Sequence, residues 1–397
     1  MKRTSFLIIT KQKLIIGIAI LFFICSIFAS GITQNNNYST LEKRIIIDAG
    51  HGGIDTGTRN NGTHEKDINL SIAKHLANYL NKGNMKIIMS RASDSLYQNN
   101  RNKDIIYRAK LANQENTDLF ISIHVNSFPS TKSFGGQTFY TPNSAKSKKL
   151  AKFIQKELIA IQPKNYRQVK PGAFYVLERT KMPAVLVEVG FLSNPEDYQR
   201  LTNNKTRKKI AKAIEQGIIN YLNSNLHLPP SNKEKPASLT NNYPKEKITI
   251  DNNFKLYFAE ANNNQESLTP VAKEIPVTKI FTNNQSLIEN IAYRSLLDLI
   301  SGPKPNSNLY PVIPPETKLL GIEVKNDIAY VNFSEELTTN HWGGSTSEIL
   351  TVSSIVKTLT QFSEIEKVQI LISGKKIKSI NGHLLLNNAI TKKDLPL

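Results

Sequence analysis

Two histidines and two glutamates in the first half of the chain have side chains suited to hydrolytic chemistry: His51, Glu65, His124 and Glu188. Two imidazoles and one carboxylate are a common ligand set for catalytic zinc, which keeps its fourth position for water. A second carboxylate beside that water can act as a general base. Zinc lowers the pKa of the water and polarises the attacked carbonyl. These four residues therefore suffice to hydrolyse an amide. The set favours zinc, although cobalt and manganese are feasible in vitro.

Residue type alone does not prove such a site. A single histidine in a glycine-rich turn is more often structural, and a carboxylate at a strand end is more often a cap or half of an ion pair. Two other histidines, His64 and His75, compete as ligands. His64 is the stronger rival because it precedes Glu65. We predict that both rivals lie on the surface.

An alternation of apolar strands and amphipathic helices places the four residues. Predicted strands end just before His51 and His124, Glu188 lies near the end of another, and Glu65 begins a helix. Active sites of open α/β sheets lie beyond the carboxyl ends of the strands, so we expect all four residues at one rim. The fold class is α/β, a mostly parallel sheet flanked by helices. The expected strands are Arg44–Asp48, Lys86–Ser90, Leu119–Ile123, Gly136–Tyr140 and Ala184–Val189, and the apolar faces of the helices span Ile68–Leu80, Ile105–Ala112, Leu150–Leu158 and Ile210–Tyr221.

Four segments make the interpretation specific. They are AGHGGIDTG (Ala49–Gly57), EKDINLSIAKHL (Glu65–Leu76), SIHVNS (Ser122–Ser127) and VEVGFLSNPED (Val187–Asp197). Together, and in this order across residues 44–222, they resemble the zinc-dependent N-acetylmuramoyl-L-alanine amidases with a type-3 amidase domain. The resemblance implies that His51, Glu65 and His124 bind one Zn²⁺ and that Glu188 is the catalytic acid/base. It also implies that the cleaved bond joins the lactyl group of muramic acid to L-alanine in peptidoglycan.

Further positions match the same family. Arg91 and Arg108 are candidates for supporting the site or binding substrate, with a surface ion network as the equal alternative. Asn126 is placed to contact substrate or orient a ligand. Ser90 and Ser127 stand where the family often has Thr and Ala, and neither change removes a ligand or the base. Some family members carry a helical insertion that plugs the zinc site. We expect no such insertion here. If the activity is restrained, we expect the restraint to come from the second domain or from a partner.

The chain divides into six parts. An uncharged stretch of 19 residues, long enough to span a bilayer, follows a basic N-terminus that is expected to stay in the cytoplasm. The rest then lies outside the membrane, in the cell envelope. Ala29-Ser30-Gly31 leaves a cleaved signal peptide as the alternative. We assign 1–13 as cytoplasmic, 14–32 as transmembrane anchor or signal segment, 33–43 as spacer, 44–224 as zinc amidase domain, 225–274 as linker and 275–393 as an α+β module.

Composition limits the partners. The formal charge is +19 and Cys25 is the only cysteine, so no intramolecular disulfide forms. Ile24 precedes Cys25 where a lipid-attachment site normally has a small residue, so we do not expect lipidation. The positive charge favours a polyanionic neighbour such as anionic wall polymers or the membrane surface. It is spread along the chain and no nucleic-acid-binding motif stands out, so nucleic acid is not an expected partner. A regulatory protein partner stays unidentified.

The C-terminal module resembles a second family. The matching segments are LLDLISGP (Leu296–Pro303), IPPETKLLGIEVKNDIAYVNFSEEL (Ile313–Leu337) and the run 344–359. They resemble the spore-germination and sporulation module known as GerMN. We see no cluster of His, Cys or paired carboxylates in this module and infer binding or assembly. His341 and Trp342 lie in a predicted loop, where they contact sugar or pack into the core.

Three functions fit these residues. The first is an amidase that remodels peptidoglycan, which the complete ligand set and Glu188 favour. The second is a non-catalytic wall-binding scaffold with a degenerate amidase fold. The third is another zinc amidohydrolase, such as a peptidoglycan carboxypeptidase or deacetylase. The ligand chemistry permits this third function, and only the four-segment resemblance opposes it.

Overall fold

The computed structural model describes residues 42–81, 85–224, 253–262, 265–274 and 287–395. Lys43–Leu397 forms one compact unit. The predicted anchor or signal segment, 14–32, lies outside the described residues, as do its flank 1–13 and nearly all of the spacer 33–43. Within the described ranges, no helix is both long and apolar enough to cross a membrane.

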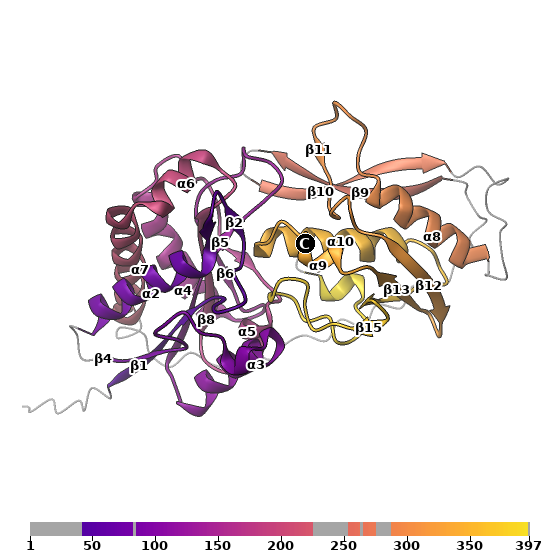
Figure 1. Cartoon of the computed structure of the whole chain (residues 1–397). Coiled ribbons are helices and arrows are strands. Elements are labelled where there is room, and N and C mark those ends of the chain that lie inside the picture. The colour runs from indigo at the N-terminus through magenta and orange to yellow at the C-terminus, as the bar shows by residue number, and fades with distance from the viewer. Residues whose placement is uncertain (1–41, 82–84, 225–252, 263–264, 275–286, 396–397) are drawn as a thin grey trace, which may run out of the picture. The chain divides into compact units, whose positions relative to one another are not determined.

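The first half of the described chain folds around a six-stranded sheet with strand order β4-β1-β5-β8-β6-β7 (Figure 1). Strands β4, β1, β5 and β8 are mutually parallel, whereas β6 is antiparallel to β8. All eight residues of β5 (Leu119–Asn126) and of β8 (Ala184–Phe191) are buried, as expected for central strands covered on both faces. The predicted class, a mostly parallel sheet flanked by helices, is confirmed.

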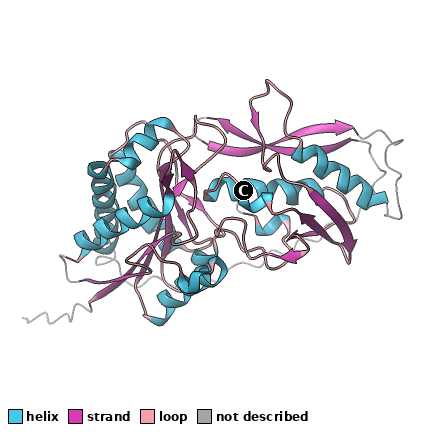
Figure 2. Ribbon diagram, viewed as in Figure 1, coloured by secondary structure: helices cyan, strands magenta, loops and turns pink. Residues whose placement is uncertain are grey.

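Helices cover both faces of this sheet (Figure 2). Ile45 and Ile47 of β1 share an apolar cluster with residues of α2, α4 and α7, such as Ile72, Ile154 and Ile214. Ile46 belongs to the other cluster, on the opposite face, because successive side chains of a strand alternate. The remaining bounds are β1 Lys43–Ala49, β2 Arg59–Asn60, β3 Thr63–His64, α2 Glu65–Leu80, β4 Met85–Met89, η1 Tyr97–Asn99, α3 Arg101–Gln114, β6 Gln137–Tyr140, α4 Ala145–Ala160, β7 Lys170–Pro171, α5 Tyr175–Glu178, α6 Pro195–Thr202 and α7 Asn204–Ser224.

Two strands of the first half are longer than predicted. The strand expected to end at Ile123 continues as β5 to Asn126, and the strand expected to end at Val189 continues as β8 to Phe191. His124 therefore lies inside a strand rather than after it. The polar residues His124 and Asn126 hid this extension, because their polarity indicated a loop.

The second half begins earlier than predicted. Residues 225–274 were expected to be a linker in which the apolar patch 254–258 was a candidate short strand, but β9 (Asn253–Asn262) and β10 (Gln265–Glu274) form an antiparallel hairpin within that range. The module predicted from residue 275 therefore includes these strands. Phe254, Leu256 and Phe258 are buried, and this alternation gives the hairpin an apolar face. Asn, Lys and Pro around it produced the appearance of a linker.

The rest of the second half matches the predicted α+β module. A four-stranded sheet has the order β12-β13-β14-β15, and β11 pairs with β9. Helix α10 is buried along nearly its whole length and packs against β9, β14 and α8. The bounds are α8 Leu287–Ile300, β11 Leu309–Tyr310, β12 Leu319–Lys325, β13 Ile328–Phe333, α9 Glu336–Thr339, α10 Ser345–Leu359, β14 Lys367–Ile372, β15 Lys375–Lys376 and η3 Lys392–Asp394.

The two halves share a core and a buried ion pair. One apolar cluster contains Phe120 and Leu186 of the six-stranded sheet together with Val352 of α10. Arg167 donates two hydrogen bonds of 2.9 and 2.8 Å to the carboxylate of Glu266 in β10, and both side chains are buried. This paired geometry satisfies both charges where water is excluded. The contacts hold the module against the sheet.

Removing one charge of this pair is expected to destabilise the unit. Glu266→Gln leaves Arg167 buried without its counter-charge, which costs about 3–5 kcal/mol of unfolding free energy. Burial alone would raise the pKa of Glu266, but Arg167 holds it below 4.5. The ion pair therefore contributes its full share of the unfolding free energy above about pH 4.5. This contribution is lost as the pH falls through the lower pKa that Glu266 has in the folded state.

Urea unfolding at pH 7 and at pH 4 and below measures this effect. The difference between wild type and Glu266→Gln should shrink in acid, and exposed Glu316→Gln is the control. Equal stability of Glu266→Gln and wild type at pH 7 would contradict the assignment.

Candidate metal centre

The turn that carries His51 is held by two buried arginines. Arg108 of α3 donates to the carbonyls of Ala49 and His51, at 2.6 and 2.7 Å, and pairs with Asp48 at the end of β1. Arg91 donates to the carbonyls of Ala49 and Gly50, at 2.9 and 3.0 Å. Residue His51 has φ of 60°, a strained conformation for a side chain of this type, which these bonds help to hold.

The charges in this support are balanced. Burial alone would raise the pKa of Asp48, but Arg108 and hydrogen bonds from Ser122 and Ser90 lower it to about 2. Arg108 also donates to Asp104 of its own helix, and the two carboxylates keep its pKa above the ordinary value in spite of burial. Arg91 and Arg108, predicted as supports or substrate-binding groups, bind the backbone beneath the site in this structure.

Replacing Arg108 by lysine is expected to weaken metal binding. An ammonium group cannot span Asp48, Asp104 and the carbonyl of His51 as the planar guanidinium does. Loss of such outer supports typically reduces metal affinity roughly 10- to 100-fold. Chelator competition measures the affinity, and Lys110→Arg, an exposed change on the same helix, is the control. Unchanged affinity in Arg108→Lys would contradict the supporting role.

Three of the predicted residues meet at the end of the sheet. Oε1 of Glu65 lies 3.0 Å from Nδ1 of His124 and 3.3 Å from Nε2 of His51. The same carboxylate accepts the backbone N–H groups of Val125 and Thr58, each at 2.9 Å. All three side chains are buried. The backbone bonds fix Glu65 between the two imidazoles.

Close packing explains the glycine before His51. A Cβ atom at Gly50 would lie 2.2 Å from Cε1 of His124, nearer than two non-bonded atoms can approach. The strand β1 therefore ends against the ring of His124. Any larger residue at Gly50 would displace that ring.

The fourth predicted residue, Glu188, lies in register with His124. The two residues are Cα partners in the parallel pair β5 and β8, which places their side chains on the same face. Glu188 is fully buried, and neither carboxylate oxygen makes a hydrogen bond to the described residues; Ser345 approaches it without hydrogen-bond geometry. Burial and then the charge of Glu65 raise the pKa of Glu188 to about 7.

The imidazoles differ in electrostatic environment. Burial would lower the pKa of His51, but Glu65 and Asp55 raise it well above 6.5. Nδ1 of His51 lies 2.8 Å from the carboxylate of Asp55, while its Nε2 is buried without a hydrogen bond among the described residues. Burial lowers the pKa of His124 to about 4, which keeps that ring neutral. A metal ion binds neutral imidazoles and an anionic Glu65, so metal binding at His51 would displace the proton that Glu65 and Asp55 hold on that ring.

A third histidine, which was not among the predicted ligands, joins the centre. His383 lies in the second half, and ligand atoms of His51, His124 and His383 lie within 4.8 Å of one another. The residue carries no local motif. The signal for it was Glu348, a charged residue in the buried helix α10, whose carboxylate lies 2.9 Å from Nδ1 of His383. A buried carboxylate needs a partner.

The remaining predicted residues lie around the centre or away from it. Asn126 donates to Oγ1 of Thr346 at 2.7 Å, so the second half occupies its amide. His64 precedes α2 and His75 lies on it, both only partly exposed, and neither belongs to the cluster of imidazoles. Trp342 and His341 line a groove of about 870 Å³ that reaches His51.

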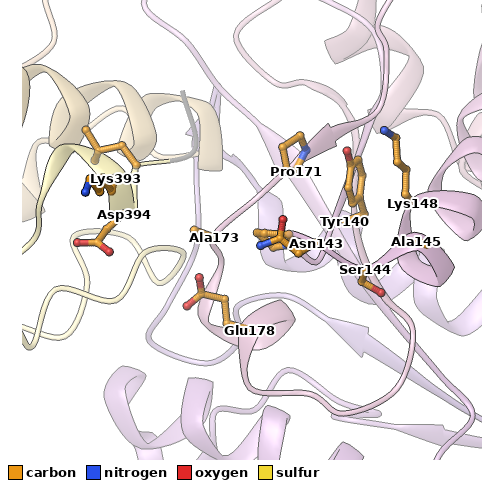
Figure 3. A pocket seen from close by; sticks show the side chains of 12 residues that line it. Tyr140, Asn143, Ser144, Ala145, Lys148, Pro171, Ala173, Glu178, Lys393 and Asp394 are labelled. Atoms are coloured by element: carbon orange, nitrogen blue, oxygen red, sulfur yellow. The ribbon is translucent and has the colours of Figure 1, made fainter. Parts of the chain in front are cut away.

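A second hollow is a weaker candidate. Figure 3 shows a pocket of about 680 Å³ whose lining includes Tyr140, Lys148, Glu178 and Asp394. Among the described residues that line it, none is histidine or cysteine. Glu178 is exposed. The pocket therefore lacks the ligand types that the first centre concentrates.

The fold and the centre together define a class of protein. An α/β sheet carries buried His and Glu side chains able to hold a metal ion, beside a carboxylate whose pKa is raised. Nε2 of His383 has no hydrogen-bond partner among the described residues, and Nε2 of His51 has only the carboxylate of Glu65, 3.3 Å away. Both atoms fit a metal, because a buried nitrogen without a hydrogen bond is costly. This arrangement is typical of metal-dependent hydrolases.

Comparison with known proteins identifies the family. The family model described as N-acetylmuramoyl-L-alanine amidase matches residues 45–220. The germination-specific N-acetylmuramoyl-L-alanine amidase of Bacillus subtilis is 37% identical over 188 residues, which cover 45% of this chain and 79% of that protein. The chain belongs to the N-acetylmuramoyl-L-alanine amidase family and is a peptidoglycan hydrolase.

Other matches cover the same half. The N-acetylmuramoyl-L-alanine amidase LytC of Bacillus subtilis is 39% identical over 179 residues, 45% of this chain but 35% of that protein. The CwlD amidase of Clostridioides difficile, solved in complex with the GerS lipoprotein, is 39% identical, with 46% of this chain and 100% of that chain covered and a TM-score of 0.45.

A family model described as sporulation and spore germination matches residues 255–378, in the second half of the chain. The resemblance to a GerMN module is thereby confirmed.

Proposed function

We propose that the chain is a zinc-dependent amidase in which His51, Glu65 and His124 hold the metal and Glu188 is the acid/base. The observation that carries this proposal is the meeting of the three ligands at one carboxylate oxygen, with His124 and Glu188 in register on adjacent strands. Two ligands about 2.0–2.1 Å from a tetrahedral zinc ion are roughly 3.3 Å apart, close to the separations around Glu65.

Zinc, when bound, supplies a water of lowered pKa and polarises the scissile carbonyl. Glu188 takes the proton of the attacking water and returns it to the nitrogen of the leaving amine. Its pKa of about 7 suits both transfers near neutral pH. Asp55 holds Nδ1 of His51, so that Nε2 is the nitrogen that would bind the metal. Glu65 stays ionised because the two histidines lower its pKa well below 4.5 in spite of burial.

The bond that we propose is cleaved is the amide between the lactyl group of muramic acid and L-alanine of the stem peptide. This substrate lies outside the cytoplasmic membrane, so the enzyme acts in the cell envelope. The apolar segment 14–32 is proposed to anchor it there, with a cleaved signal peptide as the alternative. The charge of +19 would hold the enzyme near anionic wall polymers or the membrane surface.

The alternatives from the sequence have less support. A degenerate scaffold would not need a buried carboxylate of raised pKa beside three convergent ligands. A carboxypeptidase or a deacetylase would use the same metal chemistry, and it is the family match across residues 45–220 that favours the amidase bond.

Product analysis tests the proposal. Purified peptidoglycan is incubated with wild type and with His383→Ala, which lacks the third histidine of the centre. Each incubation contains either zinc or a chelator. New amino termini are then labelled with fluorodinitrobenzene. Labelled L-alanine that appears only with metal is the expected result. Release of D-alanine or acetate, or no release from either protein when each holds one zinc ion, would refute the amidase assignment.

A further inference from the structure

The ring of His383 lies against both predicted histidine ligands. Its centroid is 5.6 Å from that of His51 and 5.1 Å from that of His124, about as near as those two are to each other, at 5.0 Å. His383 is buried, with an exposed fraction of 2%. Its Nε2 has no hydrogen-bond partner among the described residues. Three buried imidazoles therefore face one another.

The other ring nitrogen of His383 is held by a built support. Glu348 of α10 accepts from Nδ1 of His383 at 2.9 Å and from its backbone N–H at 3.1 Å. The same carboxylate accepts from the hydroxyl of Ser379 at 2.6 Å and the N–H of Ile380 at 3.0 Å. The loop 379–384 is thus wrapped around one buried anion. The pair of Glu348 and His383 repeats the pair of Asp55 and His51.

The first turn of α10 and the segment before it bring this support onto the rim of the sheet. Oγ of Ser347 donates to the carbonyl of Ser127 at 2.8 Å, and Oγ1 of Thr58 donates to the carbonyl of Trp342 at 3.0 Å. A Cβ atom on Gly344, whose φ is +76°, would lie 2.5 Å from the backbone nitrogen of Ser127. Only glycine permits so close an approach.

His383 itself is tied to the first half. Its carbonyl accepts from the N–H of Tyr175 at 3.0 Å, and the next residue, Leu384, bridges to Phe174. The loop is therefore held from both sides: Glu348 fixes it in the module, and Phe174 and Tyr175 fix it beside the sheet. These bonds make the position of the ring specific.

We propose that Nε2 of His383 is a fourth protein ligand of the metal and that it closes the site. The inference rests on the proposed function for the identity of the other three ligands, His51, Glu65 and His124. A carboxylate on the far nitrogen is the usual support of a metal-bound histidine, because it fixes the tautomer and ring orientation. Glu348 provides that support.

A closed site has a chemical consequence. Catalytic zinc has three protein ligands and an exchangeable position, whereas four protein ligands characterise structural sites. With His383 bound, the attacking water has no place, and the groove lined by Trp342 ends at His51. The chain is then a latent hydrolase. It becomes active when loop 379–384 withdraws, and the second module is the element that restrains it.

Cobalt spectroscopy tests the coordination without relying on activity. The full chain and His383→Ala are loaded with Co²⁺ and titrated with azide, which binds an open metal position. The azide concentration for half of the spectral change should be at least about tenfold higher in wild type, because apparent affinity falls with the fraction of open sites. His383→Ala should also hold zinc at least about tenfold more weakly, since it lacks a ligand.

Matched controls separate ligation from folding. His75→Ala removes a histidine on α2 that hydrogen-bonds Asn204, and it should behave as wild type in both titrations. X-ray absorption of the wild-type zinc protein counts imidazole ligands without any substitution. Three imidazoles are expected. Two imidazoles in wild type, or equal azide responses in wild type and folded His383→Ala, would overturn the proposal.

The outcomes also separate this inference from the proposed function. If the azide responses differ as expected but neither protein releases L-alanine, His383 is a ligand and the amidase assignment fails. If both proteins release L-alanine at equal rates and respond equally to azide, the amidase stands and the fourth ligand is refuted. Release that is faster from His383→Ala, together with the azide difference, supports both.

Discussion

Replacing Glu188 by glutamine is expected to reduce turnover roughly 10²- to 10⁴-fold, the usual contribution of a positioned general acid/base. The amide keeps the shape of the carboxylate but neither takes the proton of the attacking water nor returns it to the leaving amine. Glu188 is buried, and it is not one of the three proposed ligands. Zinc should therefore remain bound at one ion per chain. The effect of Glu188→Gln on turnover is measured both in the wild-type protein and in the His383→Ala variant. Zinc content is determined on the same samples.

The control for Glu188 is a carboxylate in the other pocket. Glu178 is exposed and lines the hollow in Figure 3, so Glu178→Gln should leave turnover unchanged. A large loss of turnover in Glu178→Gln would indicate that the reaction takes place in that pocket. Near-normal turnover in Glu188→Gln would exclude Glu188 as the acid/base, and loss of zinc from it would assign Glu188 to the ligand set instead.

The second large effect concerns the metal. His124→Ala should weaken zinc binding by more than about 100-fold, beyond the 10- to 100-fold typical of losing an outer support, because it removes one of the three proposed direct ligands. The change also frees Oε1 of Glu65 from its contact with Nδ1 of His124. Turnover should fall with zinc occupancy. Competition with a chromophoric chelator measures the affinity.

His64→Ala is the matched control for this substitution. His64 was the rival ligand beside Glu65, but its side chain is 37% exposed and its nearest acidic partner is Asp67, at 3.8 Å. The zinc affinity of His64→Ala should equal that of wild type. If His64→Ala loses the metal while His124→Ala keeps it, the ligand set proposed above is wrong.

The sheet and its rim were predictable because local signals agreed there. Apolar runs gave β1, β5 and β8 nearly in place, and apolar residues every four positions gave α2. His51, Glu65, His124 and Glu188 followed from their positions near strand ends and from the resemblance. The exact end of β5 did not, because His124 and Asn126 are polar residues that are buried by tertiary structure.

Little in the sequence indicated the contribution of the second half. His383 lies far along the chain from His124, and nothing in its neighbours indicates a ligand. Its placement depends on Glu348 folding the loop 379–384 and on Gly344 approaching Ser127. Both are long-range contacts. Binding or assembly was expected of the module, and restraint by the second domain or by a partner stays a prediction.

Hydrolysis in H₂¹⁸O tests the central claim most directly. Purified peptidoglycan is digested by His383→Ala and by wild type with zinc, and the products are analysed by mass spectrometry. The account predicts one ¹⁸O atom in the lactyl carboxylate of peptide-free glycan and unlabelled stem peptides that begin with L-alanine, with more product from His383→Ala. Label in the new carboxylate of a peptide that has lost its terminal D-alanine, in acetate or at a glycan reducing end would contradict it.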